Sequence, residues 1–448
     1  MLHSGFIGLG TMGHNLMLSL LDGGLHVVAH SYSPDEMDRA RRLTDKAQFE
    51  DSLENFVAAL PSPRRILLMV TAGESVDKVL ADLTFRLHAG DIVIDGGNSH
   101  FNDTRRRSAS LGEANLRYVG CGISGGEAGA RHGAALMPGG DASALDECDD
   151  IFRALTAWYG DDPCYAPVGP DGAGHFVKMV HNGIEYGIMQ LIAELFFILR
   201  QNGLDLADCA NIFASLNSGQ AASYLLEITA DILRQKDSLS EDAIIDRISD
   251  VAGQKGTGRW TVDASLDLGV PVPTIEAALS ARNLSAGNRQ LPITASAVSA
   301  SDPGGLADGF ETLAIAAYAQ GFDLLSAASD HFDWQLKLPD IARLWRGGCI
   351  IRAAILDDMA IELGKNVSLL AGDLAARIRL DAANRIGVAA LEAGVPAPAT
   401  LASIAWLQTL RAERLPTAMI QAQRDYFGRH GFKRTDVEGI HHHDWDAT

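Results

Sequence analysis

The sequence feature that most constrains the fold is a glycine-rich turn that begins at residue 8. A short apolar pair, Phe6 and Ile7, runs into the pattern G-x-G-x-x-G, and a leucine-rich amphipathic segment follows. In this setting the first glycine permits a tight turn, the second lets backbone approach a pyrophosphate, and the third lets the helix pack on the strand. The N-terminus of that helix favours phosphate. The predicted dinucleotide contacts in the turn are Gly8, Leu9, Gly10, Thr11, Met12 and Gly13.

Further apolar runs at 64–70, 91–97 and 116–126 alternate with helical segments. Such runs are typical of buried parallel strands, so we expect an α/β, doubly wound, Rossmann-like domain over residues 1–175. Ligands of such sheets lie beyond the carboxyl ends of the strands. The candidates at those ends are Val70, Thr71, Ala72, Asn98, Ser124, Gly125 and Gly126. Each of these segments, taken alone, is better explained as an ordinary glycine turn.

The residues after the second predicted strand bear on the choice between NAD and NADP. NAD enzymes commonly carry Asp or Glu there, whereas NADP enzymes carry Arg nearby. Here the positions hold Ser31, Tyr32 and Ser33. Asp35 and Glu36 are expected to serve a helix N-terminus, while Arg39, Arg41 and Arg42 either reach back or form a solvated face. This loop therefore predicts no strong selection of either cofactor.

From about residue 176 the chain shows long helical periodicity and few strand candidates. We expect a large all-α domain over 176–420 and a C-terminal tail over 421–448. Two segments match at an offset of 132 residues, pairing Tyr186 with Tyr318 and Asp208 with Asp340. This match suggests a faint internal duplication, with chance similarity between amphipathic helices as the alternative.

One predicted helix, at 172–191, carries a polar stripe within an otherwise apolar segment. Lys178, His181, Asn182 and Glu185 stand at i, i+3, i+4 and i+7, which places them on one helix face. From the helix alone, a solvated face is the better explanation, and an active site is the alternative.

Composition excludes some classes of protein. The formal net charge of −20 argues against nucleic acid as a partner. We found no apolar run of about 18 residues, so no membrane span is expected, and the N-terminus lacks the pattern of a signal peptide. The five cysteines form no C-x-x-C pair, which argues against a zinc site or a disulfide frame and fits the cytoplasm.

Basic and polar residues also gather at turns of the helical part. The segment GQKGTGRW (253–260) contains Lys255 and Thr257, Arg282 follows in the next helix, and the tail carries Arg424 and His430. A glycine-flanked Lys-x-Thr is a plausible phosphate cradle, although a single motif of this kind is more often a surface turn.

These motifs together resemble one family. GLGTMG, DGGNS, SGGEAGARHG, GAGHFVKMVHNGIEYG, AGQKGTGRW, WRGGCIIR and QAQRDYFG occur in the order seen in the decarboxylating 6-phosphogluconate dehydrogenases, and they extend over nearly the whole chain. The resemblance implies oxidative decarboxylation of 6-phosphogluconate to ribulose 5-phosphate and CO2 in the pentose phosphate pathway, with NADP or NAD and without a metal. It thereby favours the active-site interpretation of the polar stripe.

Residue roles follow from the same resemblance. Lys178 is the implied general base and later acid, and Glu185 the acid that protonates the enediol. The implied contacts of the sugar acid are Asn98, Ser124, Gly125, Gly126, His181 and Asn182. Those of the phosphate are Tyr186, Lys255, Thr257, Arg282, Arg424 and His430. In the family the last two come from a second subunit, which implies a homodimer.

Two departures from the family pattern affect the cofactor. The family usually has Asn-Arg-Thr at the positions of Ser31, Tyr32 and Ser33, and tends to have Lys at Thr71. We therefore expect relaxed use of both dinucleotides, with NADP slightly favoured on family grounds alone. His442 and Trp445 match a His-x-x-Trp pattern of the family and are taken as native.

Two other functions remain alternatives. A related β-hydroxyacid dehydrogenase would share the glycine turn and the lysine, but would not need the phosphate-binding set that includes Lys255, Arg282 and Arg424. A non-catalytic dinucleotide-binding scaffold would not need both Lys178 and Glu185.

Overall fold

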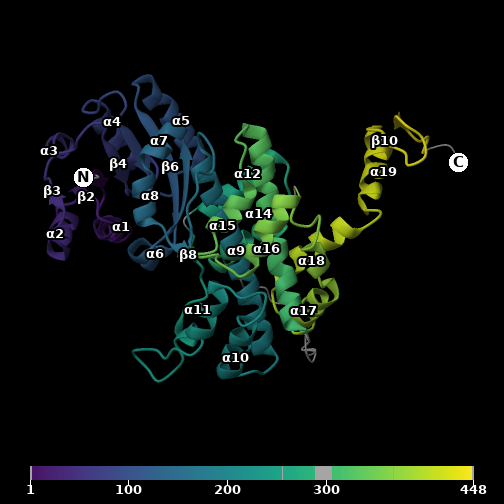
Figure 1. The fold of residues 1–448 in the computed structure, drawn as a ribbon. Coiled ribbons are helices and arrows are strands. Elements are labelled where there is room, and N and C mark those ends of the chain that lie inside the picture. The colour runs from purple at the N-terminus through teal and green to yellow at the C-terminus, as the bar shows by residue number, and fades with distance from the viewer. Residues whose placement is uncertain (1–2, 255, 288–304, 367, 446–448) are drawn as a thin grey trace. The chain divides into compact units, whose positions relative to one another are not determined.

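The structure is a computed structural model that describes residues 3–254, 256–287, 305–366 and 368–445. These residues form two compact units, Met1–Ser403 and Ile404–Thr448. Figure 1 shows the elements of both units.

The first unit opens with a seven-stranded sheet in the order β3-β2-β1-β4-β5-β6-β7. The strands are β1 (His3–Ile7), β2 (His26–His30), β3 (Gln48–Phe49), β4 (Arg65–Leu68), β5 (Ile92–Asp95), β6 (Arg117–Ser124) and β7 (Ala135–Gly140). Each neighbouring pair is parallel except β6 with β7, which is antiparallel. The sheet confirms the predicted doubly wound class, and its antiparallel edge strand β7 was not predicted from the sequence.

Helices cover both faces of this sheet. They are α1 (Thr11–Asp22), α2 (Pro34–Leu43), α3 (Leu53–Ala58), α4 (Glu74–Thr84), α5 (Phe101–Glu113), α6 (Gly126–His132), α7 (Ala142–Glu147) and α8 (Asp149–Leu155). A hairpin of β8 (Trp158–Tyr159) and β9 (Asp162–Pro163) follows. Adjacent strand residues belong to opposite apolar cores: Phe6 packs in the core that includes Leu16 of α1, and Ile7 in the core that includes Leu80 of α4.

The rest of the first unit is helical. Its elements are α9 (Ala173–Gln201), α10 (Leu206–Leu216), α11 (Tyr224–Ile232), η1 (Ile244–Arg247), α12 (Thr257–Leu268), α13 (Pro273–Ser285), α14 (Leu306–Phe332), α15 (Leu338–Leu344), α16 (Ile355–Lys365), η2 (Ala375–Arg377), α17 (Leu380–Glu392) and the start of α18 (Pro398–Arg411). The pair α9–α10 and the pair α14–α15 begin and end at nearly the offset of the predicted duplication. This agreement supports the repeat.

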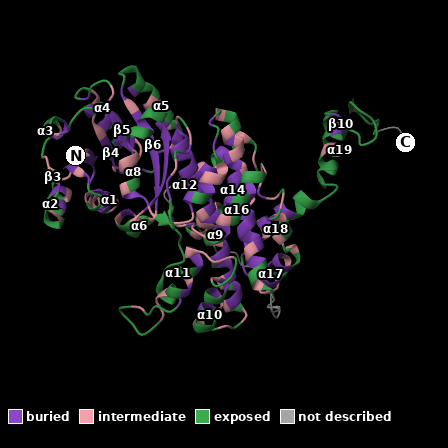
Figure 2. Cartoon of the chain, viewed as in Figure 1, coloured by how far each residue is buried: buried purple, intermediate pink, exposed green. Residues whose placement is uncertain are grey.

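Helix α9 joins the sheet to the helices, and Figure 2 shows buried residues in the sheet and along the helices around α9. A Cβ atom added at Gly174 would lie 2.0 Å from the Gly120 carbonyl oxygen of β6, so backbone meets backbone here. On other sides, Gly183 of α9 faces Thr261 of α12, and Gly321 of α14 faces Ile184 of α9. Such contacts require residues without a side chain, and they fix α9 at the centre of the unit.

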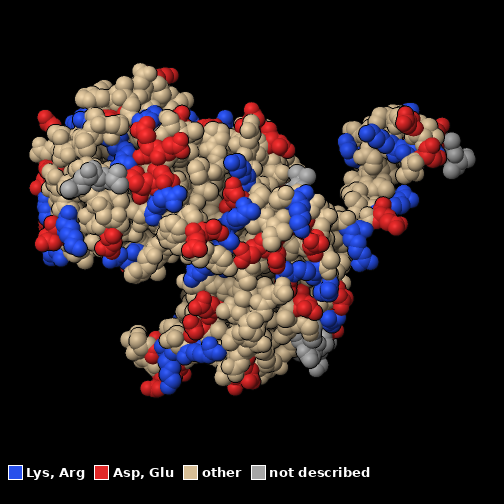
Figure 3. Space-filling model, in the orientation of Figure 1, with Lys and Arg blue, Asp and Glu red and all other residues tan. Residues whose placement is uncertain are grey.

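By length and composition alone, α9 could cross a membrane, but 67% of its apolar window is buried inside the protein. A core helix passes the same test. Figure 3 shows acidic and basic side chains interspersed over the visible face of the first unit.

The second unit holds the end of α18, α19 (Thr417–Gly428), β10 (Phe432–Lys433) and β11 (Ile440–His441). Its loop closes around the buried carboxylate of Asp425, which accepts hydrogen bonds from the Gly431 amide (3.0 Å), the His442 ring (2.8 Å) and the Trp445 indole (3.0 Å). His442 and Trp445 therefore belong to the folded tail.

Candidate active site

The glycine turn has the geometry that a dinucleotide pyrophosphate needs. Gly8 has φ +97°, and a Cβ atom at Gly13 would lie 2.0 Å from the Gly8 carbonyl oxygen, so neither position accommodates a side chain. Helix α1 has Gly10 as its N-cap, no side-chain cap and no acidic residue in its first turn. Its free N–H groups can therefore bind phosphate.

A pocket of about 740 Å³ lies beside this turn. It is lined by seven of the predicted cofactor residues: Gly8, Gly10, Ser31, Tyr32, Ser33, Val70 and Thr71. The other predicted ones, Leu9, Thr11, Met12, Gly13, Ala72 and Asn98, are not among its lining residues. The pocket fits the cofactor half of the predicted site.

Three charged residues of the pocket, Glu36, Lys78 and Asp82, were missed by the sequence reasoning. Glu36 lies in the first turn of α2, as expected, but its carboxylate accepts from groups outside that helix, the Leu9 amide (3.0 Å) and the Ser31 hydroxyl (2.6 Å). Among the candidate arginines, none lines the pocket, and Arg41 pairs with Asp51 at 2.5 Å.

Three of the four residues in the polar stripe of α9 are buried, and Glu185 is partly buried, which decides against a solvated face. Lys178 is 6% exposed, His181 0% and Asn182 8%. The Lys178 Nζ lies 3.3 Å from Nδ1 of His181, which is 3.3 Å from the Asn182 Oδ1 and 3.8 Å from the Glu185 carboxylate. On the other side of the imidazole, Nε2 lies 3.1 Å from the hydroxyl of Ser124 at the end of β6. The predicted residues thus form one connected cluster.

Burial shifts the pKa values of the titratable groups in this cluster. It lowers the pKa of the Lys178 ammonium from 10.5, and Glu185 opposes the shift. Burial also lowers the pKa of His181 well below its usual value, and Lys178 adds to that effect. It raises the pKa of Glu185 from 4.5, against the influence of Lys178 and Arg282. The amine is therefore biased toward its free base and the carboxyl toward its acid form.

Local sequence explains how the lysine reaches this position. A Cβ atom at Gly122 of β6 would lie 2.3 Å from the Lys178 Cβ, so α9 can approach the strand only because residue 122 is glycine. Beyond Ser124, Gly125 adopts φ +130° and lies close to the Gly348 carbonyl of the WRGG segment. The buried Trp345 of that segment meets the His181 ring edge-on at 5.7 Å. Gly122 and Trp345 were not predicted as site residues.

The predicted phosphate residues fall into three groups. Tyr186, Arg282 and Thr257 lie together: the Arg282 guanidinium stacks 3.6 Å from the Tyr186 ring, and Gly258, next to Thr257, packs against that ring. Lys255 lies outside the described residues. Arg424 and His430 belong to the second unit, so the structure does not relate them to the other residues.

Asn98 and Gly126 are exposed at the ends of β5 and β6, where the sequence placed them.

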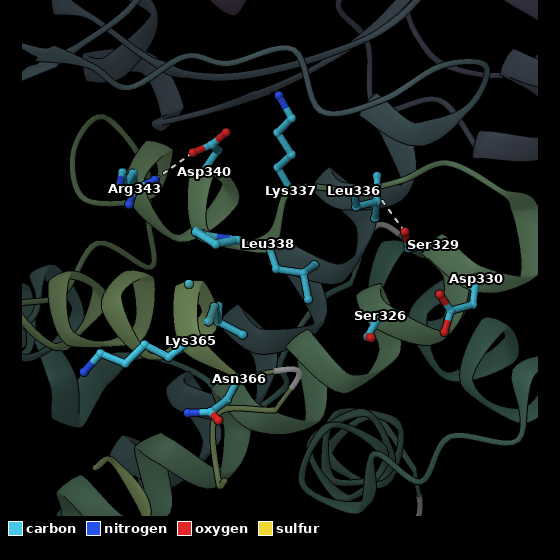
Figure 4. A pocket seen from close by; sticks show the side chains of 13 residues that line it. Ser326, Ser329, Asp330, Leu336, Lys337, Leu338, Asp340, Arg343, Lys365 and Asn366 are labelled. Carbon is cyan, nitrogen blue, oxygen red and sulfur yellow. Dashed lines mark hydrogen bonds and ion pairs between the residues drawn. The ribbon is translucent and has the colours of Figure 1, made fainter. Parts of the chain in front are cut away.

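Another pocket, of about 630 Å³, lies among α14, α15 and α16 (Figure 4). It contains none of the predicted residues, and two of its basic lining residues form ion pairs, Arg343 with Asp340 at 2.7 Å and Lys365 with Asp373 at 3.4 Å. The cluster on α9 and the pocket at the glycine turn are therefore the better candidates.

Comparison with known proteins relates both parts of the chain to one enzyme family. Residues 3–169 match the NAD binding domain of 6-phosphogluconate dehydrogenase, and residues 174–445 match the C-terminal domain of that enzyme. The chain is 41% identical to a decarboxylating 6-phosphogluconate dehydrogenase of Lactococcus lactis subsp. cremoris, with 98% of each chain covered. Two Bacillus subtilis relatives, one named NADP-dependent and one NAD-dependent, are 40% and 39% identical.

A solved structure shows the same fold. The 6-phosphogluconate dehydrogenase of Plasmodium falciparum, studied in its apo form and with NADP or 6-phosphogluconate, superimposes with a TM-score of 0.91 at 36% identity. The alignment covers 99% of this chain and 100% of the other. The chain belongs to the 6-phosphogluconate dehydrogenase family.

Proposed function

We propose that the chain converts 6-phospho-D-gluconate to D-ribulose 5-phosphate and CO2 while reducing NADP or NAD. The observation that carries this proposal is the buried cluster of Lys178, His181 and Glu185 at the carboxyl end of β6. One helix face carries an amine whose pKa is lowered and a carboxyl group whose pKa is raised. These two groups can carry out the proton transfers of an oxidation followed by decarboxylation. Full-length relatives named for this reaction support it.

When bound, the nicotinamide would supply the acceptor for the hydride that leaves C3 of the sugar acid. Lys178, as a free amine, takes the proton of the C3 hydroxyl, which leaves a 3-keto acid. The resulting ammonium then gives that proton to the ketone oxygen as CO2 leaves, and the electrons of the C1–C2 bond form the C2=C3 double bond of the enediol. The protonated Glu185 gives its proton to the enediol carbon that becomes C1 of the product, while Lys178 takes back the proton of the C3 hydroxyl, which becomes the product ketone.

We propose the remaining contacts by residue type. The sugar acid would contact Asn98, Ser124, Gly125, Gly126, His181 and Asn182. The phosphate would contact Tyr186, Lys255, Thr257, Arg282, Arg424 and His430. The close stacking of Arg282 on Tyr186 supports the second set, because it holds a guanidinium beside the buried cluster.

We further propose a homodimer in which the tail of each chain completes the site of the other. The tail exposes large apolar side chains, including Met419 (65%), Tyr426 (64%) and Phe427 (72%). A hollow of about 460 Å³ lies between these residues and Trp445. An exposed apolar surface of this kind favours a protein partner.

The organisation that serves this function is proposed as a cofactor domain at 1–175, a substrate and dimerisation domain at 176–420 and the tail at 421–448. We place the enzyme in the cytoplasm, which the five buried, free cysteines support.

The proposal is tested by following reduced dinucleotide through its near-ultraviolet absorbance with purified protein. We expect turnover with 6-phosphogluconate and little with unphosphorylated gluconate, because gluconate lacks the phosphate that Arg282, Tyr186 and Thr257 are proposed to bind. Equal turnover of the two acids would contradict the proposed substrate and favour a related hydroxyacid dehydrogenase.

A further inference from the structure

Glu36 stands in the first turn of α2, and its side chain lies at the wall of the cofactor pocket. Its carboxylate bridges the two segments that meet there, accepting from the amide of Leu9 in the glycine turn at 3.0 Å and from the hydroxyl of Ser31 after β2 at 2.6 Å. The other carboxylate oxygen lies 3.4 Å from where a Cβ atom of Gly10 would stand. The negative charge is thus held directly beside the glycine turn.

The simplest alternative is a capping role, because Ser33-x-x-Glu36 matches the pattern of a capping box. In that motif the glutamate side chain accepts from the amide of the capping serine. Here the amide of Ser33 donates to the Ser31 hydroxyl at 3.2 Å, and only the serine half of the motif forms, with the Glu36 amide donating to the Ser33 hydroxyl at 3.4 Å. The carboxylate is therefore not used to cap the helix.

The charge of the pocket wall reinforces this observation. A second carboxylate, Asp82, lines the same pocket and accepts from the Tyr32 hydroxyl at 3.2 Å. Lys78 is the only cation among the described lining residues; its side chain is 77% exposed and lies 3.9 Å from Glu74. The wall near the end of β2 is consequently acidic.

In dinucleotide-binding folds, the region between the glycine turn and the end of the second strand holds the adenosine ribose. An acidic group there accepts a hydrogen bond from a free ribose hydroxyl, whereas it repels a 2′-phosphate, which carries nearly two negative charges. The bridging position of Glu36 limits its ability to turn away, because doing so would leave the Leu9 amide and the Ser31 hydroxyl without their acceptor.

We propose that Glu36 is a specificity-determining residue that favours NAD over NADP in this chain. This inference rests on the proposed use of a nicotinamide dinucleotide and deepens it. It replaces the sequence-based expectation of relaxed use with NADP slightly favoured, because that expectation left Glu36 out of the pocket.

The test compares the wild type with Glu36→Gln, using Asp35→Asn as a matched control. Asp35 is an exposed carboxylate in the same first helical turn and does not line the pocket. Binding of NADH and of NADPH is measured by fluorescence without sugar acid, and kcat/KM is measured for NAD and NADP with 6-phosphogluconate.

We expect the wild type to favour the NAD form by about tenfold or more, which corresponds to about 1.4 kcal/mol. Glu36→Gln should shift the ratio toward NADP by at least about tenfold, while Asp35→Asn should leave it nearly unchanged. The inference is overturned if the wild type favours NADPH, or if the two variants shift the ratio equally.

Two further arms keep the result interpretable. If Glu36→Gln does not fold, Tyr32→Arg adds a cation to the same wall and should shift the ratio in the same direction, whereas an unchanged ratio would contradict an electrostatic selection by this wall. Lys78→Met should affect NADPH little; a large, selective loss of NADPH binding would show that Lys78 holds the phosphate and would overturn the proposal. Discrimination in binding without turnover of 6-phosphogluconate would refute the proposed function but not the role of Glu36.

Discussion

The amine of Lys178 combines near-complete burial with a position beside His181 and Glu185. Replacing it with methionine keeps the length and removes the base. We expect Lys178→Met to lower kcat by about 10²–10⁴-fold, the usual contribution of a positioned acid or base. Dinucleotide affinity should remain nearly intact, since Lys178 does not line the cofactor pocket. Turnover close to that of the wild type would remove Lys178 from the mechanism.

The same variant should be more stable than the wild type. Because burial lowers the pKa of Lys178 below 10.5, the unfolded chain binds a proton that the folded chain does not, and stability falls as pH decreases through that window. Methionine removes this penalty. Denaturant unfolding should therefore show a gain for Lys178→Met that grows from alkaline toward neutral pH, and a pH-independent difference would contradict a lowered pKa.

Glu185 has the opposite bias, with a pKa raised from 4.5 by burial. Its acid form therefore persists to higher pH than in an exposed glutamate. Glu185→Gln should reduce kcat because the amide cannot donate a proton to the enediol, although the 3-keto acid still forms. The alkaline limb of the kcat–pH profile that reports this acid should also disappear. A variant with an unchanged profile would mean that another group is the acid.

At the scale of elements, one buried arginine links the loops that follow β4 and β5. Arg107 of α5 donates to the Gly73 carbonyl (2.9 Å) before α4 and to the Ser99 hydroxyl (3.2 Å) after β5, and it lies 3.6 Å from the buried Asp95 carboxylate. It also binds Asp77 of α4 at 2.9 Å. These bonds fix the strand ends that carry Thr71 and Asn98.

Arg107→Met should lower the free energy of unfolding by about 3–5 kcal/mol, because it leaves buried Asp95 without its cation. It should also raise the KM for dinucleotide. The neighbouring Arg106 binds the same Asp77 at 3.0 Å but is 56% exposed. Arg106→Met should therefore lower the free energy of unfolding by no more than about 1 kcal/mol. Equal effects of the two substitutions in urea titrations would show that the buried bonds of Arg107 are not the cause of the lost stability.

The elements that the sequence predicted are those with a strong local pattern. The glycine turn between β1 and α1 and the polar stripe of α9 are set by residue spacing along one segment, and the structure confirms both. The edge strand β7 and the buried Arg107 depend on partners distant in the chain, which spacing does not reveal. Glu36 was missed for a different reason: its helix-start pattern is genuine, but the carboxylate finds better donors in Leu9 and Ser31.

At the scale of the whole molecule, the proposed dimer predicts complementation between two impaired variants. Arg424→Ala should raise the KM for 6-phosphogluconate sharply, because guanidinium–phosphate hydrogen bonds are charge-assisted and often bidentate. Mixing Arg424→Ala with Lys178→Met protein should restore activity, since each heterodimer contains one site with both residues intact. No recovery after verified subunit exchange would show that the tail serves its own chain.

The proposed reaction oxidises C3 and then releases C1 of 6-phosphogluconate. It can be followed by supplying substrate labelled at C1 and measuring labelled CO2, reduced dinucleotide and ribulose 5-phosphate in the same reaction. We expect equal amounts of all three, and none of them above background with Lys178→Met. Reduced dinucleotide with the label retained in a six-carbon product would contradict it.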